Sequence, residues 1–176
     1  MWLVSALTML SIALLIIVAP LAAAGAHDRV AFTIYGAFAV LCHQLPERSY
    51  FIAGHKLAVC SRCTGLYAGF VFTMLIYPLV RPLRSIVWPP REWLILAAVP
   101  MAIDFSLTFF GVWENTHTSR LITGILLGSV AVFYVMPGLA ELSLRTTRTS
   151  PPVFIRQTPE PMASAPSDYS APERRI

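Results

Sequence analysis

The feature that most constrains this chain is a set of four long stretches with almost no charged side chains. Met1 to Ala26, Cys63 to Val80 and Leu121 to Ala140 carry none, and Trp93 to Trp113 carries only Asp104. Each stretch is long enough to cross about 30 Å of hydrocarbon at about 1.5 Å per helical residue. With 56% hydrophobic and 12% charged residues, the composition also departs from that of soluble domains. The sequence therefore predicts an all-α, polytopic protein of the lipid bilayer, with spans near residues 2–24, 63–80, 93–112 and 121–140.

The spans belong to a single membrane domain that we place at residues 1–148. Its loop at 27–62 contains a further apolar stretch, Val30 to Leu41, which is too short to cross a bilayer and predicts an interfacial or re-entrant helix. Residues 149–176 hold six of the 14 prolines and few apolar residues. Such a segment buries too little surface to offset its conformational entropy, so we predict a disordered tail.

The first apolar stretch has two interpretations. It ends in the small residues Ala22 to Ala26, which resemble a signal-peptidase site. It lacks a basic segment before the apolar core, and that core is longer than in most signal peptides. We therefore expect a retained membrane anchor, with a cleaved signal peptide as the alternative.

The distribution of basic residues predicts an orientation. Those between the second and third spans fall on the same side as those that follow the fourth span: Arg81, Arg84, Arg91, Arg145, Arg148 and Arg156. By the positive-inside tendency, and by a small margin, both termini are expected in the cytoplasm and the cysteine loop outside the cell membrane. The net charge of +4 is spread over loops and tail, which argues against a nucleic-acid partner.

All three cysteines of the chain lie within 22 residues, in the sequences Cys42-His43-Gln44 and Cys60-Ser61-Arg62-Cys63. Thiolates suit zinc, and a Cys-x-x-Cys turn places two sulfurs on one ion. We therefore expect a site for zinc or a similar metal built from Cys42, Cys60 and Cys63 with one histidine. Neighbouring residues share an ion only with an unusual backbone, so local geometry favours His55 over His43 as the fourth ligand.

A second hypothesis makes Cys60 and Cys63 a redox pair. A Cys-x-x-Cys at a helix N-terminus with Arg62 between the cysteines favours a lowered thiol pKa. The protein would then be a membrane thiol-disulfide oxidoreductase with Cys42 as the resolving thiol. The neighbouring His43 and Gln44 are unexplained by this hypothesis.

A third hypothesis rests on an internal similarity between the second and fourth spans. Both open on an arginine that is followed by Thr-Gly and a second glycine four residues later: Arg62-Cys63-Thr64-Gly65-x-x-x-Gly69 and Arg120-Leu121-Ile122-Thr123-Gly124-x-x-x-Gly128. In a four-span chain these helices run parallel, and the glycines allow close backbone packing. Two helix N-termini beside arginines favour an anion such as a lipid phosphate.

Asp104 lies in the same region, since it falls toward the outer end of the third span. A carboxylate at that depth needs a partner, and Arg62 and Arg120 are the candidates. In the third hypothesis Arg62, Arg120 and Asp104 are candidate catalytic or binding residues of a lipid-phosphate or anion site. Arg48 would contribute further positive charge.

These motifs together resemble a family of small prokaryotic membrane proteins known only as a domain of unknown function. The resemblance runs from about Leu41 to Gly128. It rests on Cys42-His43-Gln44-Leu45-Pro46-Glu47-Arg48-Ser49-Tyr50, Cys60-x-Arg62-Cys63-Thr64-Gly65, Ile103-Asp104 and Arg120-x-x-Thr123-Gly124. The family implies a polytopic membrane protein, favours His43 over His55 as a ligand and names no reaction. Whether the protein is an enzyme is therefore open.

Overall fold

A computed structural model describes residues 1–83 and 85–148 of the chain. The predicted disordered tail, 149–176, lies outside the described residues. The elements follow in the order α1 (Trp2–Ala24), α2 (Asp28–Ala39), the 3-10 helix η1 (Pro46–Arg48), β1 (Phe51–Ile52), β2 (His55–Lys56), α3 (Ser61–Val80), α4 (Arg91–Phe109) and α5 (His117–Arg148).

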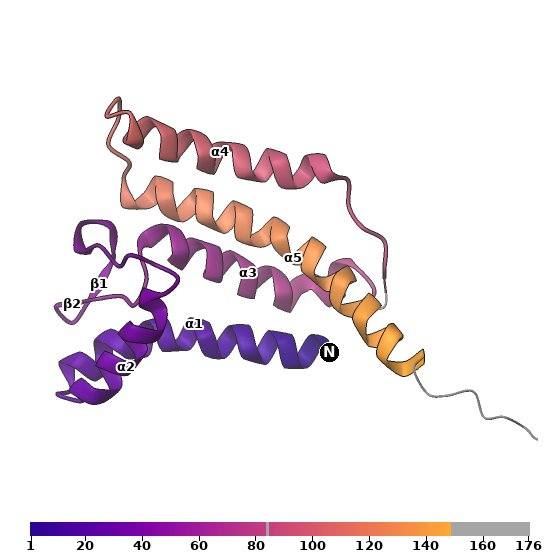
Figure 1. Cartoon of the computed structure of the whole chain (residues 1–176), viewed down its shortest axis with the longest axis horizontal. Helices are drawn as coiled ribbons and strands as arrows, with labels where there is room; N and C mark the ends of the chain where they lie inside the picture. Colours follow the sequence, from indigo (N-terminus) through magenta and orange to yellow (C-terminus); the bar gives the residue numbers. More distant parts are fainter. Residues whose placement is uncertain (84, 149–176) are drawn as a thin grey trace, which may run out of the picture.

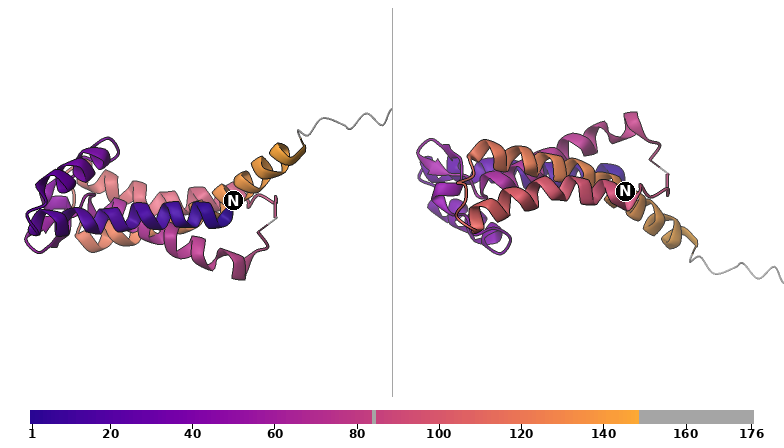
Figure 2. Two further views of the ribbon diagram at one scale, coloured as in Figure 1. Left: turned by 90° about the horizontal axis from the view of Figure 1, so that it is seen from below. Right: turned by 90° about the horizontal axis from the view of Figure 1, so that it is seen from above.

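Within the described residues, four helices are long and apolar enough to cross a membrane, which confirms the predicted all-α, four-span architecture. They lie side by side in an elongated bundle (Figures 1 and 2). The predicted short helix is also present, as the 12-residue α2. The spans are Trp2–Ala24, Ser61–Val80, Arg91–Phe109 and His117–Leu144.

The ends of the third and fourth spans differ from the predicted 93–112 and 121–140, and local backbone chemistry explains why. The chain turns after Phe109, where Gly111 has a φ of 68° that a helix does not accommodate. α5 then begins at His117, because the Thr116 hydroxyl accepts a hydrogen bond from the Ser119 N–H at 3.1 Å. This cap lets α5 start before the apolar stretch does.

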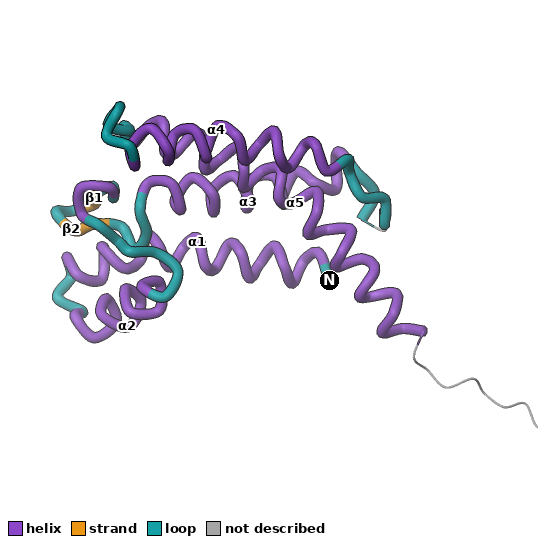
Figure 3. The backbone as a smooth tube through the Cα atoms, turned by 45° about the horizontal axis from the view of Figure 1, so that its top comes forward, coloured by secondary structure: helices purple, strands orange, loops and turns teal. Residues whose placement is uncertain are grey.

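Successive spans alternate in direction, so the described N-terminus and the end of α5 lie at one end of the bundle (Figure 1). At the opposite end lie α2, the loop with η1 and the antiparallel hairpin of β1 and β2 (Figure 3). The starts of α3 and α5 lie at that same end, as the internal similarity predicts. This end of the bundle therefore collects the polar motifs.

The two parallel helices α3 and α5 touch through their backbones. A Cβ atom added at Gly65 would lie 2.2 Å from a carbonyl oxygen of α5, and one at Gly124 would lie 2.3 Å from a carbonyl oxygen of α3. Gly69 and Gly128 make equivalent approaches one turn further along. The prediction of close glycine packing is confirmed, and no larger residue fits at these four positions without moving the helices apart.

Two buried apolar clusters hold α1, α2 and the loop before α3 in place. The first joins α1, α2 and the loop before α3, and it includes Ile16, Phe38, Cys42 and Val59. The second, at the other end, joins α1 through Ala6 to α3 and α5. Because α1 contributes to both clusters, its removal would expose both, although a retained anchor stays a prediction.

The glycine contact between α3 and α5 predicts that two glycine-to-alanine variants differ in stability. Gly124→Ala should lower stability by at least about 1–3 kcal/mol, because the new methyl group meets backbone rather than a movable side chain. Gly36→Ala in α2 is the matched control, since a Cβ there meets nothing within 4 Å and alanine favours a helix. Thermal aggregation in detergent measures both. Equal stability of the two variants would mean that α3 and α5 are not in backbone contact.

Candidate functional site

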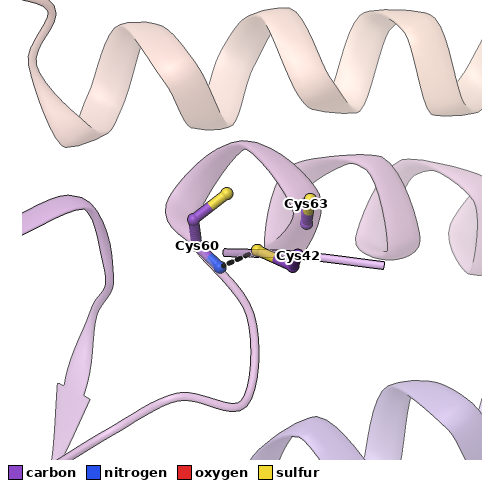
Figure 4. Close-up of side chains that lie close together, drawn as sticks. All are labelled: Cys42, Cys60 and Cys63. Carbon is purple, nitrogen blue, oxygen red and sulfur yellow. Dashed lines mark hydrogen bonds between the residues drawn. The ribbon is translucent and has the colours of Figure 1, made fainter. Parts of the chain in front are cut away.

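The three cysteine sulfurs converge at the start of α3 (Figure 4). Cys42 comes from the loop after α2, Cys60 is the residue before the helix, and Cys63 lies in its first turn. The three Sγ atoms all lie within 4.8 Å of one another. Cys42 is buried, the other two are half-buried, and all three are free thiols. This arrangement offers three soft ligands to one ion.

The start of α3 favours a thiolate in this cluster. The Cys60 N–H donates a hydrogen bond to the Cys42 Sγ at 3.2 Å. A hydrogen bond from the Cys63 side chain is the largest of the causes that lower the pKa of Cys60 to about 5. Burial acts in the opposite direction, and backbone N–H groups of Cys63 and Arg62 and the Cys42 side chain add to the lowering. Hydrogen bonds to sulfur thus stabilise the ligand form of Cys60.

A set of polar contacts around Gln44 fixes the loop that carries Cys42. Gln44 has a φ of 52°, and its side-chain amide donates to the Tyr35 carbonyl at 2.7 Å. The Lys56 ammonium donates to the Gln44 carbonyl at 2.7 Å, and the Tyr35 hydroxyl donates to the Lys56 carbonyl. The loop is thereby tied both to α2 and to the hairpin. Tyr35 and Lys56 were not expected at this site from the sequence, although Gln44 belongs to the motif Cys42-His43-Gln44.

The residues after Gln44 place Arg48 at the same site. Pro46 begins η1, and the Ser49 hydroxyl and Arg48 N–H both donate to the Leu45 carbonyl, at 2.9 and 3.0 Å. Tyr50 then donates through its hydroxyl to the carbonyl of a residue at the start of α5, at 3.2 Å. The turn therefore spans from the cysteine loop to α5 and carries Arg48 between them.

Asp104 forms its ion pair with Arg62 rather than with Arg120. The Arg62 Nη2 lies 2.6 Å from the Asp104 Oδ2, and the two side chains are only 17% and 12% exposed. Asn115 donates its amide to the same carboxylate oxygen at 2.6 Å and also to the Asp104 carbonyl. The prediction that Asp104 needs an arginine is confirmed. The sequence places Asn115 in a polar loop near the same surface, but its contacts with Asp104 and Thr108 could not be predicted, because these partners lie on another element.

Two adjoining cavities lie beside the cysteines. The first, of about 370 Å³, is lined by all three cysteines together with His43, Arg48 and Arg62. The second, of about 150 Å³, is lined by Arg48, Cys60, Arg62, Phe105, Thr108, Phe109, Asn115 and Arg120. The two share Arg48, Cys60, Arg62 and Phe105. The arginines and the cysteines, which the sequence left in separate hypotheses, therefore line one continuous region.

The two candidate histidines are placed differently. His43 is exposed and lines the larger cavity beside the cysteines. His55 is exposed on the short strand β2. Neither belongs to the group of donor atoms that lie within 4.8 Å of one another. The structure therefore brings together Cys42, Cys60 and Cys63 and leaves the fourth ligand a prediction.

The fold and this site define a polytopic membrane protein with a thiol-rich pocket at one end of its bundle. The chain belongs to the family DUF2085, described as "Predicted membrane protein", which matches residues 42–134. It is 40% identical over 113 residues to an uncharacterized protein of Methanocaldococcus jannaschii, covering 64% of this chain and 72% of that one. An uncharacterized protein of Methanothermobacter thermautotrophicus is 35% identical over 91 residues, covering 52% and 80%. No solved structure matches the chain.

The family match confirms the expected membrane family of unknown function. The matched segment contains the cysteines, Arg62, Asp104 and Arg120, and it ends within α5. Neither relative's name states an activity. The proposed signature motif itself stays a prediction.

The buried ion pair predicts a coupled set of stability changes. Arg62→Gln or Asp104→Asn alone should each cost about 3–5 kcal/mol, because one charge is left buried without its partner. The double variant should be less harmful than the sum of the two. Thermal aggregation in detergent gives the comparison. The matched series with Arg120→Gln should show weaker coupling to Asp104→Asn, and strict additivity in the Arg62 series would contradict the pair.

Proposed function

We propose that this integral membrane protein carries a zinc site whose ligands include Cys42, Cys60 and Cys63. The convergence of their three Sγ atoms within 4.8 Å is the observation that supports it. Zinc binds thiolates at about 2.3 Å, which places the sulfurs of a tetrahedral site about 3.8 Å apart. A small contraction of the cluster would therefore bring all three into contact with one ion.

His43 is the fourth ligand that we propose. It follows Cys42 directly and lines the cavity onto which the three sulfurs open. Rotation of its exposed ring toward the sulfurs would close a Cys₃His site, and a closed site of this kind is structural. His55 is the alternative, but it lies on the hairpin. With neither histidine bound, the fourth position would face the arginine-lined cavity and accept a ligand from it.

The redox hypothesis remains as a competing account of Cys60 and Cys63. The free thiols and the lowered pKa of Cys60 are compatible with thiol chemistry. The convergence of Cys42 on the same point favours the metal, because a Cys-x-x-Cys disulfide needs only two sulfurs. The buried position of Cys42 in an apolar cluster likewise suits a fixed ligand better than an exchanging thiol.

We infer that the protein also binds an anion, such as a lipid phosphate, at the end of the bundle that carries the cysteines. The observation that favours it is Arg120, a buried arginine that lines the smaller cavity. Asp104 has its ion pair with Arg62. We therefore propose Arg62 and Arg120 as the ligands of the anion, and Asp104 as the residue that holds Arg62 in place.

We place the cysteine end of the bundle outside the cell membrane and both termini in the cytoplasm. The basic residues of the loop after α3 and of the chain around the end of α5 support this orientation. The four alternating spans support a common side for both termini.

The metal proposal predicts the zinc content of purified variants. Wild-type protein in detergent should carry about one zinc per chain, and Cys42→Ser, Cys60→Ser and Cys63→Ser should each lose it. Their yield of folded protein should fall as well, because the binding free energy of a structural ion contributes to folding. His43→Ala should behave like the cysteine variants, and His55→Ala is its control. Elemental analysis alongside a thiol titration measures both quantities.

Three results would count against parts of this proposal. Full zinc retention in Cys60→Ser and Cys63→Ser would remove these cysteines as ligands. A metal-free wild type with a Cys60–Cys63 disulfide under non-reducing conditions would favour the oxidoreductase instead. Loss of zinc in His55→Ala but not in His43→Ala would reverse the assignment of the fourth ligand.

The orientation predicts the accessibility of three tags. A reporter after Arg148 and another in the loop from Arg81 to Arg91 should both report the cytoplasm, because basic segments resist export. A tag beside Lys56 should be accessible from outside intact cells. A protected Lys56 tag with the other two exposed would invert the orientation, and opposite sides for the two reporters would contradict four spans.

A further inference from the structure

The smaller cavity holds more positive than negative charge. Among the described residues that line it, Arg48, Arg62 and Arg120 are cationic. Asp104, the ion-pair partner of Arg62, supplies one negative charge beside it. A zinc ion with three thiolates would supply one more. One positive charge is then left over, and because Arg48 is exposed, solvent shares in stabilising that charge.

Arg120 is the buried arginine of this cavity that has no carboxylate partner among the described residues. It is only 9% exposed, and within the described residues its side chain makes no hydrogen bond and no ion pair. A guanidinium group has five N–H donors, and those of Arg120 stay accessible at the cavity, since none of its nitrogens is among the fully buried unpaired atoms of the described residues. Arg62 also keeps its Nε buried without a partner, since only its Nη2 reaches Asp104. The cavity thus has accessible, unused donors on Arg120, and Arg62 has a buried one beside it.

We propose that Arg48, Arg62 and Arg120 bind a phosphate-type oxyanion in this cavity. The inference deepens the anion-binding function proposed above and rests on it. Guanidinium groups bind phosphate oxygens with paired, charge-assisted hydrogen bonds, and three arginines can share the several oxygens of one tetrahedral group. A cavity of about 150 Å³ has room for such a group, since one water takes up about 30 Å³ in the liquid.

The surrounding helices add to the attraction. α3 begins at Ser61 and α5 at His117, so Arg62 and Arg120 both lie in the first turn of their helices. The close glycine contact keeps these two N-termini side by side. Their dipoles place partial positive charge near the cavity and favour an anion there.

The oxyanion could be the phosphate of a lipid headgroup or a free phosphate ion. Phe105 and Phe109 line the cavity and are exposed on α4, a helix whose surface is largely apolar and open. The acyl chains of a lipid with its phosphate in the cavity would leave past these rings into the bilayer. A free phosphate would use the arginines alone.

The experiment measures binding of two probes to the full chain in maltoside detergent micelles, which contain no phosphate group. The first probe is inorganic phosphate, followed by equilibrium dialysis, and the second is phosphatidic acid added to the micelles, followed by native mass spectrometry. Arg120→Gln and Arg48→Gln should each weaken binding by about tenfold or more, because charge-assisted hydrogen bonds are lost. Arg91→Gln, exposed at the opposite end of the bundle, is the matched control and should bind like wild type.

A stability measurement separates binding from a structural role. Without a ligand, Arg120→Gln should be as stable as wild type or more so, because it removes a buried charge that has no ion pair. An added probe should raise the melting temperature of wild type and not that of Arg120→Gln. A large loss of stability in the ligand-free variant would overturn the proposal, and Arg48→Gln, an exposed position, still tests binding if that variant fails to fold.

The outcomes also separate this site from the functions proposed above. Binding of either probe that both arginine variants retain would leave anion binding standing but overturn this cavity as its site. No binding of either probe would overturn both. Binding of phosphatidic acid that inorganic phosphate does not compete supports a lipid source, and competition supports the free ion. Zinc content, measured on the same samples, should be unchanged in Arg120→Gln whatever the result for the anion.

Discussion

Backbone contact between α3 and α5 is the constraint on which the rest of the site depends. Gly65 and Gly124 let each helix approach a carbonyl oxygen of the other, a distance that any side chain would prevent. This contact lies directly below the first turns that carry Arg62 and Arg120. It therefore sets the spacing of the two arginines, and the α3 start that it fixes also positions Cys60 and Cys63. The spacing of the two arginines and the position of two of the three thiols are therefore consequences of one interface, and the loop that carries Cys42 adds the third thiol.

Much of this arrangement follows from local properties of the sequence. Span length depends on uninterrupted apolar residues, and a GxxxG spacing places two glycines on one helix face whatever the neighbours are. The need of Asp104 for an arginine follows from the energy of a carboxylate in a span. Span length, glycine packing and the need for a partner are properties of one helix or of two parallel helices, so they could be predicted before the fold was known.

The remaining details depend on contacts between distant segments. Whether Asp104 pairs with Arg62 or Arg120 is decided by where α4 packs, and nothing in the spacing of the residues states it. The contacts of Gln44 with Tyr35 and Lys56 join a helix, a turn and a hairpin, each of which is short and weakly patterned. The fourth metal ligand depends on the rotamer of an exposed ring. Span ends shifted for a similar reason, since caps and turns rather than hydropathy end a helix.

Arg62 and Arg120 differ in whether the described residues give them an ion-pair partner, and this difference favours a bound ligand over packing alone as the reason for Arg120. Arg62 is paired with a carboxylate that is itself held by Asn115, which is how a buried charge is stabilised within a fold. Arg120 is at least as buried, yet the described residues give it no such partner. If both arginines served only to join helices, the bundle would be more stable with a carboxylate partner beside Arg120. It would also be more stable with a neutral residue in place of Arg120. A buried cation kept beside an open cavity is instead suited to a partner that arrives from outside the chain.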